Sequence, residues 1–322
     1  MSDIFFIELG MSEPKYNLNI HSLSHGAMTG KMLERIEQIC MDEKPDWVLL
    51  YGDTNSTLAG ALAASKLHIP IAHVEAGLRS NNLSMPEEVN RIVTDRLSTL
   101  LLCPTEQAEK NLVDEGYPLP CTGNRMQRIT NVGDIMFDAV KKFSVKSLNE
   151  TAQEVLSKVD GSYALATIHR PSNTDDIDNL KQIFEAFDEI SKNTKIVFPI
   201  HPRTRKKVAD FGLSLDNESL IMIDPVSYVT LQQLISKSKF VMTDSGGLQK
   251  EAYFHKKKCI TLREETEWSE TVSSGWNTIT GANFNKIIDA VNIIDLVPED
   301  YVDYYGSGRT GLDIISELKL NA

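Results

Sequence analysis

Residues 239–251 read Lys-Phe-Val-Met-Thr-Asp-Ser-Gly-Gly-Leu-Gln-Lys-Glu. The apolar run predicts a buried strand, and the last four residues begin a helical pattern. Unpaired N–H groups and the dipole at a helix start favour an anion, and glycines let a phosphate approach the backbone. This stretch therefore predicts a phosphate or nucleotide site at Ser245, Gly246 and Gly247. The alternative is an ordinary strand-to-helix turn in which Ser245 caps the helix.

A carboxylate follows this turn at a useful spacing. Glu251 lies one helical turn beyond Gly247, on the same face of the expected helix. Its side chain could accept hydrogen bonds from ribose hydroxyls. We therefore expect a nucleotide rather than an isolated phosphate.

Composition narrows the class of protein. The chain of 322 residues is long enough for two domains, and its net charge of −12 argues against a nucleic-acid partner. A few local cations and helix termini still suffice for a small anionic ligand. No apolar run reaches the roughly 18 residues of a membrane helix, the start lacks signal-peptide features, and the four cysteines show no metal-ligand spacing. We expect a cytoplasmic protein without a membrane or metal partner.

Strand and helix patterns alternate along the chain. Strands are expected at residues 47–53, 69–77, 99–103, 131–134, 163–169, 195–201, 220–223, 240–242, 259–263 and 277–281. Helices are expected at residues 27–43, 56–67, 87–97, 106–115, 135–142, 177–192, 228–236, 284–291 and 310–320. This alternation predicts an α/β fold with two Rossmann-like, doubly wound parallel sheets.

The domain boundaries follow from a polar segment at 143–160, which we interpret as the hinge region. We expect an N-terminal domain at 1–150, a C-terminal domain at 151–305 and a last helix within 306–322. No strand with a glycine-rich turn precedes Trp47, so the first domain is expected to lack its opening strand–helix unit.

Three carboxylates stand at strand ends or at a helix start: Asp53, Glu75 and Glu87. Carboxylates gathered at one site can shift each other's pKa and act as general acid and base. The alternatives are that Asp53 caps the next helix and that Glu87 is an ordinary first-turn acid. Glu75 has no following helix to cap, and His73 could serve only to orient it.

Other strand ends carry basic and polar side chains. His169 is a titratable ring beside Arg170, which could hold a phosphate, and the alternative is a loop histidine bonded to backbone. His201 is a weaker candidate of the same kind. Arg263 opens the run Arg-Glu-Glu-Thr-Glu, which is either a sugar-recognition segment using Thr266 and Glu267 or a solvated acidic loop.

Together these motifs resemble the non-hydrolysing UDP-N-acetylglucosamine 2-epimerase family. The resemblance rests on Gly-Asp-Thr at 52–54, His-Val-Glu-Ala-Gly-Leu-Arg at 73–79, Met-Pro-Glu-Glu-Val-Asn-Arg at 85–91, Cys-Pro-Thr-Glu at 103–106, Val-Gly-Asp-Ile-Met-Phe-Asp at 132–138, Thr-Ile-His-Arg at 167–170, Thr-Asp-Ser-Gly-Gly-Leu-Gln-Lys-Glu at 243–251 and Arg-Glu-Glu-Thr-Glu-Trp at 263–268. It implies a glycosyltransferase-B-like pair of domains whose last helix returns to the first domain. It also implies a homodimer.

The family reaction inverts C2 of UDP-N-acetylglucosamine by eliminating UDP to give 2-acetamidoglucal and adding UDP back. The product, UDP-N-acetylmannosamine, is a surface-polysaccharide precursor, and no cofactor is required. The resemblance assigns acid/base roles to Asp53, Glu75 and Glu87 and a role near the diphosphate to His169. The remaining matches concern substrate binding: the diphosphate cradle at Ser245, Gly246 and Gly247, the ribose-binding Glu251, and Arg263.

The family opens with a strand and a Gly-Thr-Arg-Pro-Glu turn, followed later by a Gln-His segment, and this sequence has neither. We therefore expect the chain to begin inside the family's first domain. Two alternatives follow. The protein is a related 2-epimerase of a modified UDP-sugar, such as a UDP-diacetamido-uronic acid, or it is a truncated, inactive UDP-binding protein.

Overall fold

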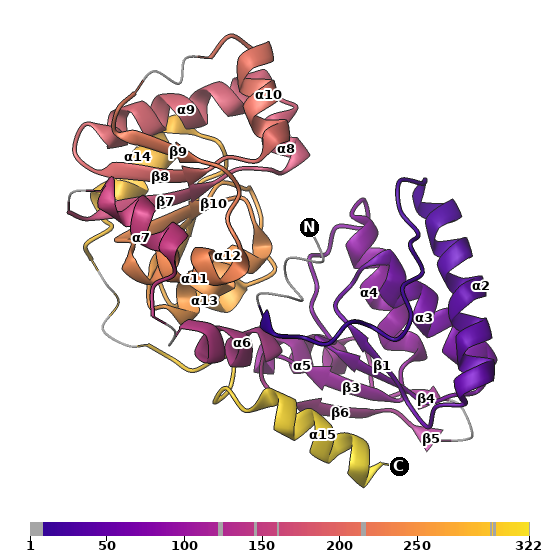
Figure 1. The fold of residues 1–322 in the computed structure, drawn as a ribbon. Coiled ribbons are helices and arrows are strands. Elements are labelled where there is room, and N and C mark those ends of the chain that lie inside the picture. Colours follow the sequence, from indigo (N-terminus) through magenta and orange to yellow (C-terminus); the bar gives the residue numbers. More distant parts are fainter. Residues whose placement is uncertain are drawn as a thin grey trace. The chain divides into compact units, whose positions relative to one another are not determined.

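The computed structural model describes residues 9–121, 125–144, 147–159, 161–213, 217–296, 298 and 301–321. The chain forms two compact units, each built on a parallel sheet (Figure 1). The small-sheet unit comprises Pro14–Asp138 and Asp303–Ala322, and the large-sheet unit comprises Met1–Glu13 and Ala139–Val302. The divisions after Asp138 and Val302 fall 12 and 3 residues before the boundaries expected after residues 150 and 305.

The small-sheet unit contains four parallel strands in the order β1-β2-β3-β6 among the described residues. Its strands are β1 (Val48–Tyr51), β2 (Ile71–Val74), β3 (Leu100–Cys103) and β6 (Arg128–Asn131), with a hairpin of β4 (Pro120–Cys121) and β5 (Arg125–Met126). Its helices are α2 (His25–Glu43), α3 (Asn55–Lys66), α4 (Pro86–Leu97), α5 (Glu106–Asp114), the start of α6 (Ile135–Ser144) and α15 (Thr310–Leu320). Between residue 9 and β1 the structure has α2 and no strand, and residues 1–8 lie outside the described residues.

Helices cover both faces of this sheet because its central strands are apolar on both sides. Ile314 of the last helix packs with Val74 and Leu102 on one face. Ala61 of α3 packs with Ile71 on the other. The last helix thus joins the first sheet through its apolar side chains.

The large-sheet unit contains six parallel strands in the order β9-β8-β7-β10-β11-β12 among the described residues. The strands are β7 (Tyr163–Thr167), β8 (Lys195–Pro199), β9 (Leu220–Ile223), β10 (Phe240–Thr243), β11 (Lys258–Thr261) and β12 (Asn277–Ile279). The helices are α7 (Glu150–Ser157), α8 (Pro171–Thr174), α9 (Ile177–Ser191), α10 (Pro202–Asp210), α11 (Tyr228–Lys237), α12 (Gly246–Phe254), α13 (Ser269–Ser273) and α14 (Phe284–Asn292).

The strand order reverses between β7 and β10, which lie side by side in the sheet. Ligands of doubly wound folds bind at the carboxyl ends of the strands, at such a switch point. The chain segments after Thr167 and Thr243 therefore meet where this topology predicts a site.

The polar segment at 143–160 differs from the hinge expected there. It contains α7, whose Val155 is buried in the same core as Leu165 and Leu234. Polar composition concealed this helix because only a narrow apolar stripe is needed to pack a short helix on a sheet. Residues 145, 146 and 160 of this segment lie outside the described residues.

Candidate active site

The turn between β10 and α12 forms the centre of the site in the large-sheet unit. Ser245 is the N-cap of α12, and its hydroxyl accepts a hydrogen bond from the backbone N–H of Leu248 at 3.4 Å. Gly246 and Gly247 are the first residues of the helix. The capping role expected as an alternative is confirmed, and it leaves the first N–H groups of the helix for an anion.

A cavity of about 210 Å³ adjoins this turn. It brings together three of the predicted residues, His169, His201 and Ser245. The rest of its wall is mainly apolar: Thr167, Ile168, Pro199, Pro225, Val226, Leu231 and Leu248. A wall that combines a few polar side chains with many apolar ones suits a ligand that has a charged part and a flat organic ring.

Asp244 organises the loop that carries His169. Its fully buried carboxylate accepts hydrogen bonds from the backbone N–H groups of His169 and Arg170, at 3.0 and 2.9 Å, and from the Asn173 side chain at 3.1 Å. Nδ1 of His169 lies 3.1 Å from the same carboxylate. Burial favours a higher pKa for Asp244, but hydrogen bonding and the charge of His169 outweigh it and lower the pKa. The ring is therefore held by a carboxylate and not by backbone alone.

Three predicted binding residues occupy the surroundings of this turn. Glu251 is buried in α12, with 5% of its surface exposed. Arg170 is the N-cap of α8, and its Nε atom is buried without a hydrogen-bond partner among the described residues. His201 caps α10 by accepting the backbone N–H of Arg203 at 3.2 Å.

Arg263 lies close to the start of α12. Its guanidinium pairs with Glu267 at 3.0 and 3.3 Å, and both side chains are about nine-tenths buried. A Cβ atom built on Gly246 would lie 3.7 Å from Nη1 of Arg263. The solvated-loop alternative is therefore wrong for this pair. The hydroxyl of Thr266 donates a hydrogen bond to Gln249 at 2.6 Å.

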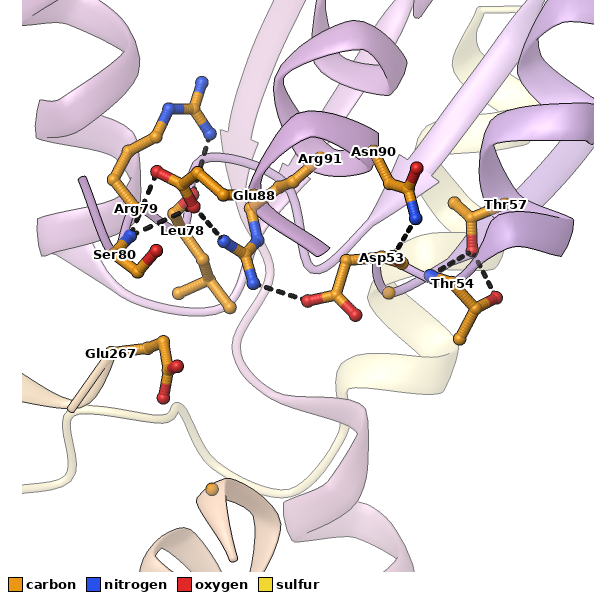
Figure 2. A network of polar contacts seen from close by, with 12 residues as sticks. Asp53, Thr54, Thr57, Leu78, Arg79, Ser80, Glu88, Asn90, Arg91 and Glu267 are labelled. Atoms are coloured by element: carbon orange, nitrogen blue, oxygen red, sulfur yellow. Dashed lines mark hydrogen bonds and ion pairs between the residues drawn. The ribbon is translucent and has the colours of Figure 1, made fainter. Parts of the chain in front are cut away.

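The small-sheet unit supplies the carboxylates. Figure 2 shows Arg91 of α4 reaching both Asp53, after β1, and Glu88 of its own helix. Glu88 is buried and accepts the backbone N–H groups of Ser80 and Asn81 at 3.1 and 3.0 Å. One guanidinium thus fixes the Asp53 carboxylate and a loop at the same time. Asp53 does not cap α3, because Thr54 is the N-cap of that helix.

The other two carboxylates are positioned by the backbone. Glu75 follows β2 with φ of +75°, a left-handed conformation that is costly for a residue with a side chain. One of its carboxylate oxygens lies 3.4 Å from the position of a Cβ built on Gly52, so Glu75 lies over the end of β1. Glu87 is half-buried and lies in the first turn of α4, where an ordinary first-turn acid was the alternative to a catalytic role.

Several charged residues that hold the site were not assigned a role from the sequence. They are Glu88, Arg91 and Asp244. Glu88 and Arg91 are spaced three residues apart on one helix, which is a usable signal for an ion pair. Nothing local marks Asp244 as the organiser of a loop 75 residues away. Among the described residues, no group of three or more His, Cys, Asp or Glu side chains is arranged to hold a metal ion.

No helix in the described part of the chain is long and apolar enough to cross a membrane. The sequence model of the UDP-N-acetylglucosamine 2-epimerase family matches residues 1–319. A UDP-N-acetylglucosamine 2-epimerase homolog of Methanococcus maripaludis is 47% identical, over 99% of this chain and 88% of the relative. The UDP-2,3-diacetamido-2,3-dideoxy-D-glucuronate 2-epimerase of Pseudomonas aeruginosa is also 47% identical, over 99% of this chain and 87% of its own.

Among solved structures, the chain is similar to the UDP-GlcNAc 2-epimerase of Methanocaldococcus jannaschii in complex with UDP-GlcNAc and UDP. The two are 43% identical, with a TM-score of 0.87, over 99% of this chain and 88% of the other. The expected fold class, two parallel-sheet α/β units of the glycosyltransferase-B-like kind, is confirmed by this similarity together with the two sheets.

Proposed function

This chain belongs to the UDP-N-acetylglucosamine 2-epimerase family, and we propose that it interconverts UDP-N-acetylglucosamine and UDP-N-acetylmannosamine. The observation that carries the proposal is the cavity at the start of α12, which places His169 beside Ser245 in the unit that would bind UDP. The similar M. jannaschii enzyme was crystallised with UDP-GlcNAc and UDP.

In this proposal the large-sheet unit holds the UDP. The N–H groups of Gly246 and Gly247, in the first turn of α12, and the positive end of that helix face the diphosphate. Arg170 supports this assignment because its buried Nε atom has no partner within the described residues. The apolar wall, including Val226, accommodates the uracil ring. Glu251, further along α12, accepts the ribose hydroxyls.

The small-sheet unit supplies the proton chemistry through Asp53, Glu75 and Glu87. A base removes the proton at C2, the electron pair forms the C1–C2 double bond, and the C1–O bond breaks to release UDP. UDP then adds back to C1 while an acid delivers a proton to the opposite face of C2. A C2 proton is weakly acidic, so both a positioned base and stabilisation of the leaving diphosphate are needed.

Arg91 supports this role for Asp53. The guanidinium pairs with the carboxylate of Asp53 and fixes its direction. Asn90 adds a hydrogen bond to the backbone carbonyl of Asp53 at 2.9 Å. Asp53 is therefore presented as an oriented carboxylate, which is the form required of a base.

The substrate is tested by a panel of UDP-sugars followed by proton NMR. We expect UDP-N-acetylmannosamine from UDP-N-acetylglucosamine. Turnover of UDP-2,3-diacetamido-2,3-dideoxy-glucuronate alone would favour the second candidate, which the similarity to the P. aeruginosa enzyme supports. Calorimetry that shows UDP binding while no UDP-sugar is converted would identify an inactive UDP-binding protein. We also propose a homodimer, which sedimentation measurements would test.

A further inference from the structure

A buried histidine in the small-sheet unit has two polar partners. His73 of β2 has no exposed surface. Its Nδ1 atom lies 2.7 Å from a carboxylate oxygen of Asp95, in α4, and its Nε2 atom lies 2.8 Å from the backbone carbonyl oxygen of Gly52. The ring does not orient Glu75 by direct contact. It joins a helix to the end of β1.

Both of these partners accept hydrogen bonds. The carbonyl of Gly52 can only accept, so Nε2 carries a hydrogen. The Asp95 carboxylate also receives the N–H of Gly77 at 3.2 Å and Nη1 of Arg79 at 2.7 Å. Burial favours a higher pKa for Asp95, but the hydrogen bonds and charges of His73 and Arg79 outweigh burial and lower the pKa. The Asp95 carboxylate therefore faces Nδ1, and the Gly52 carbonyl accepts from Nε2.

Other charged groups continue the network beyond Asp95. Arg79, which contacts Asp95, donates two hydrogen bonds to Glu115, at 2.6 and 2.8 Å. Two other titratable groups are near Asp95. Burial raises the pKa of the Cys103 thiol and of Tyr117 above their ordinary values, so both stay neutral. The Asp95 carboxylate thus holds one side of the ring, and the Gly52 carbonyl holds the other.

We propose that His73 is a positioning residue that fixes the ends of β1 and β2, and with them Asp53 and Glu75. The backbone N–H of Gly52 donates to Val74 at 3.1 Å, so the peptide groups on both sides of Gly52 are tied to β2. Gly52 has φ of +61° and would otherwise turn freely. A rotation there would move Asp53, which follows it, and the Glu75 carboxylate, which lies over it.

This assignment rests on the proposed function, because it matters for activity only if Asp53 and Glu75 act on the substrate. The hydrogen bond from the ring to Gly52 is tested without turnover, by nitrogen-15 NMR of the histidine side chains. We expect a hydrogen on Nε2 of His73, because the Gly52 carbonyl can only accept. A His73 ring without a hydrogen on Nε2 would overturn the proposal.

Variants then test the positioning role. The amide of His73→Gln can still reach the Gly52 carbonyl, whereas that of His73→Asn reaches only toward Asp95. We expect kcat to fall by roughly 100-fold in His73→Asn and by clearly less in His73→Gln, because small misplacements of reacting groups have effects of that order. The Kd for UDP should stay unchanged in both, since UDP binding is assigned to the large-sheet unit.

The matched control is His255→Gln, a change of another buried histidine outside the proposed site, which should leave kcat unchanged. A folded His73→Asn protein with normal kcat, or a loss confined to KM, would contradict the positioning role. If the unaltered protein converts no UDP-sugar, the proposed function fails, and the NMR result still decides whether His73 donates a hydrogen bond to Gly52.

Discussion

At the scale of single residues, the side chains with a proposed catalytic or positioning role are held by other charged groups. Arg91 fixes Asp53, Asp244 fixes the loop and ring of His169, and Asp95 fixes the ring of His73. Breaking one partner of a buried charge pair is strongly destabilising, so such pairs hold their geometry firmly. Asp53, His169 and His73 are therefore already oriented for their proposed roles.

The first prediction concerns Glu75, the proposed acid/base residue with the left-handed backbone. Glu75→Gln keeps the size of the side chain and removes its capacity to transfer a proton. Turnover should fall by roughly 100- to 10,000-fold, the usual contribution of general acid–base catalysis. Steady-state kinetics and UDP calorimetry measure the two effects. Unchanged turnover would show that Glu75 does not carry the proton.

The second prediction concerns Asp244. In Asp244→Asn the carboxylate that receives Nδ1 of His169 and two backbone N–H groups is lost. We expect weaker UDP binding and lower kcat together, because both the diphosphate loop and the ring lose their orientation. The matched control is Asp175→Asn, which removes only exposed ion pairs with Arg203 and Lys207. Equal effects of the two changes would contradict this role.

At the scale of elements, the strand–turn–helix unit of β10 and α12 could be predicted from the sequence, because an apolar run, small residues and a helical pattern follow one another. Some expected strands were too long. Residues 69–77 were expected as a strand, but β2 ends at Val74 because Glu75 turns the chain with a positive φ. The short hairpin of β4 and β5 was missed, since two-residue strands show no periodicity.

The residues that orient the site could not be predicted in the same way. Asp53 and Arg91 are 38 residues apart, and His169 and Asp244 are 75 apart. Their partnership depends on which strands become neighbours in the sheet, which local patterns do not contain. The family motifs suggested candidate site residues that local patterns could not pair. They gave no role to Glu88, Arg91 or Asp244.

The third prediction concerns the contact between α11 and α12, where Nε2 of His255 meets Gln232 at 2.9 Å. Burial lowers the folded-state pKa of His255 to about 4, below its ordinary value of 6.5. As the pH falls from 6.5 to 4, the unfolded chain binds a proton that the folded chain does not. The free energy of unfolding should therefore fall, by up to about 1.4 kcal/mol per pH unit from this group.

Urea unfolding at pH values from 7 to 5 measures this slope, above the range where carboxylates dominate. His255→Gln should show a shallower loss than the unaltered protein. The difference between the two proteins isolates this ring from the other histidines. Parallel curves would contradict a neutral, buried His255.

At the scale of the whole molecule, each unit is closed by apolar packing on both faces of its sheet, and the C-terminal segment belongs to the small-sheet unit. The Asp138 carboxylate accepts the backbone N–H groups of Thr310 and Gly311, at 3.1 and 2.9 Å, at the start of α15. An acid far away in the sequence therefore caps the last helix.

The fourth prediction tests this cap. Asp138→Ala should lower the free energy of unfolding by about 1 kcal/mol, as for other lost helix caps. The matched control is Asp313→Ala, an exposed acid in the first turn of the same helix, whose loss should cost less. Chemical unfolding measures both. Equal stability of Asp138→Ala and the unaltered protein would contradict the role of Asp138.

The central claim is that this chain eliminates and re-adds UDP at C2 and C1 of UDP-N-acetylglucosamine. The most direct measurement is NMR of C2 after incubation with UDP-N-acetylglucosamine in deuterium oxide. We predict deuterium at C2 of the UDP-N-acetylmannosamine formed and, as the reaction reverses, at C2 of the recovered substrate. Epimerised product that retains its original hydrogen at C2, or no product and no deuterium, would contradict the claim.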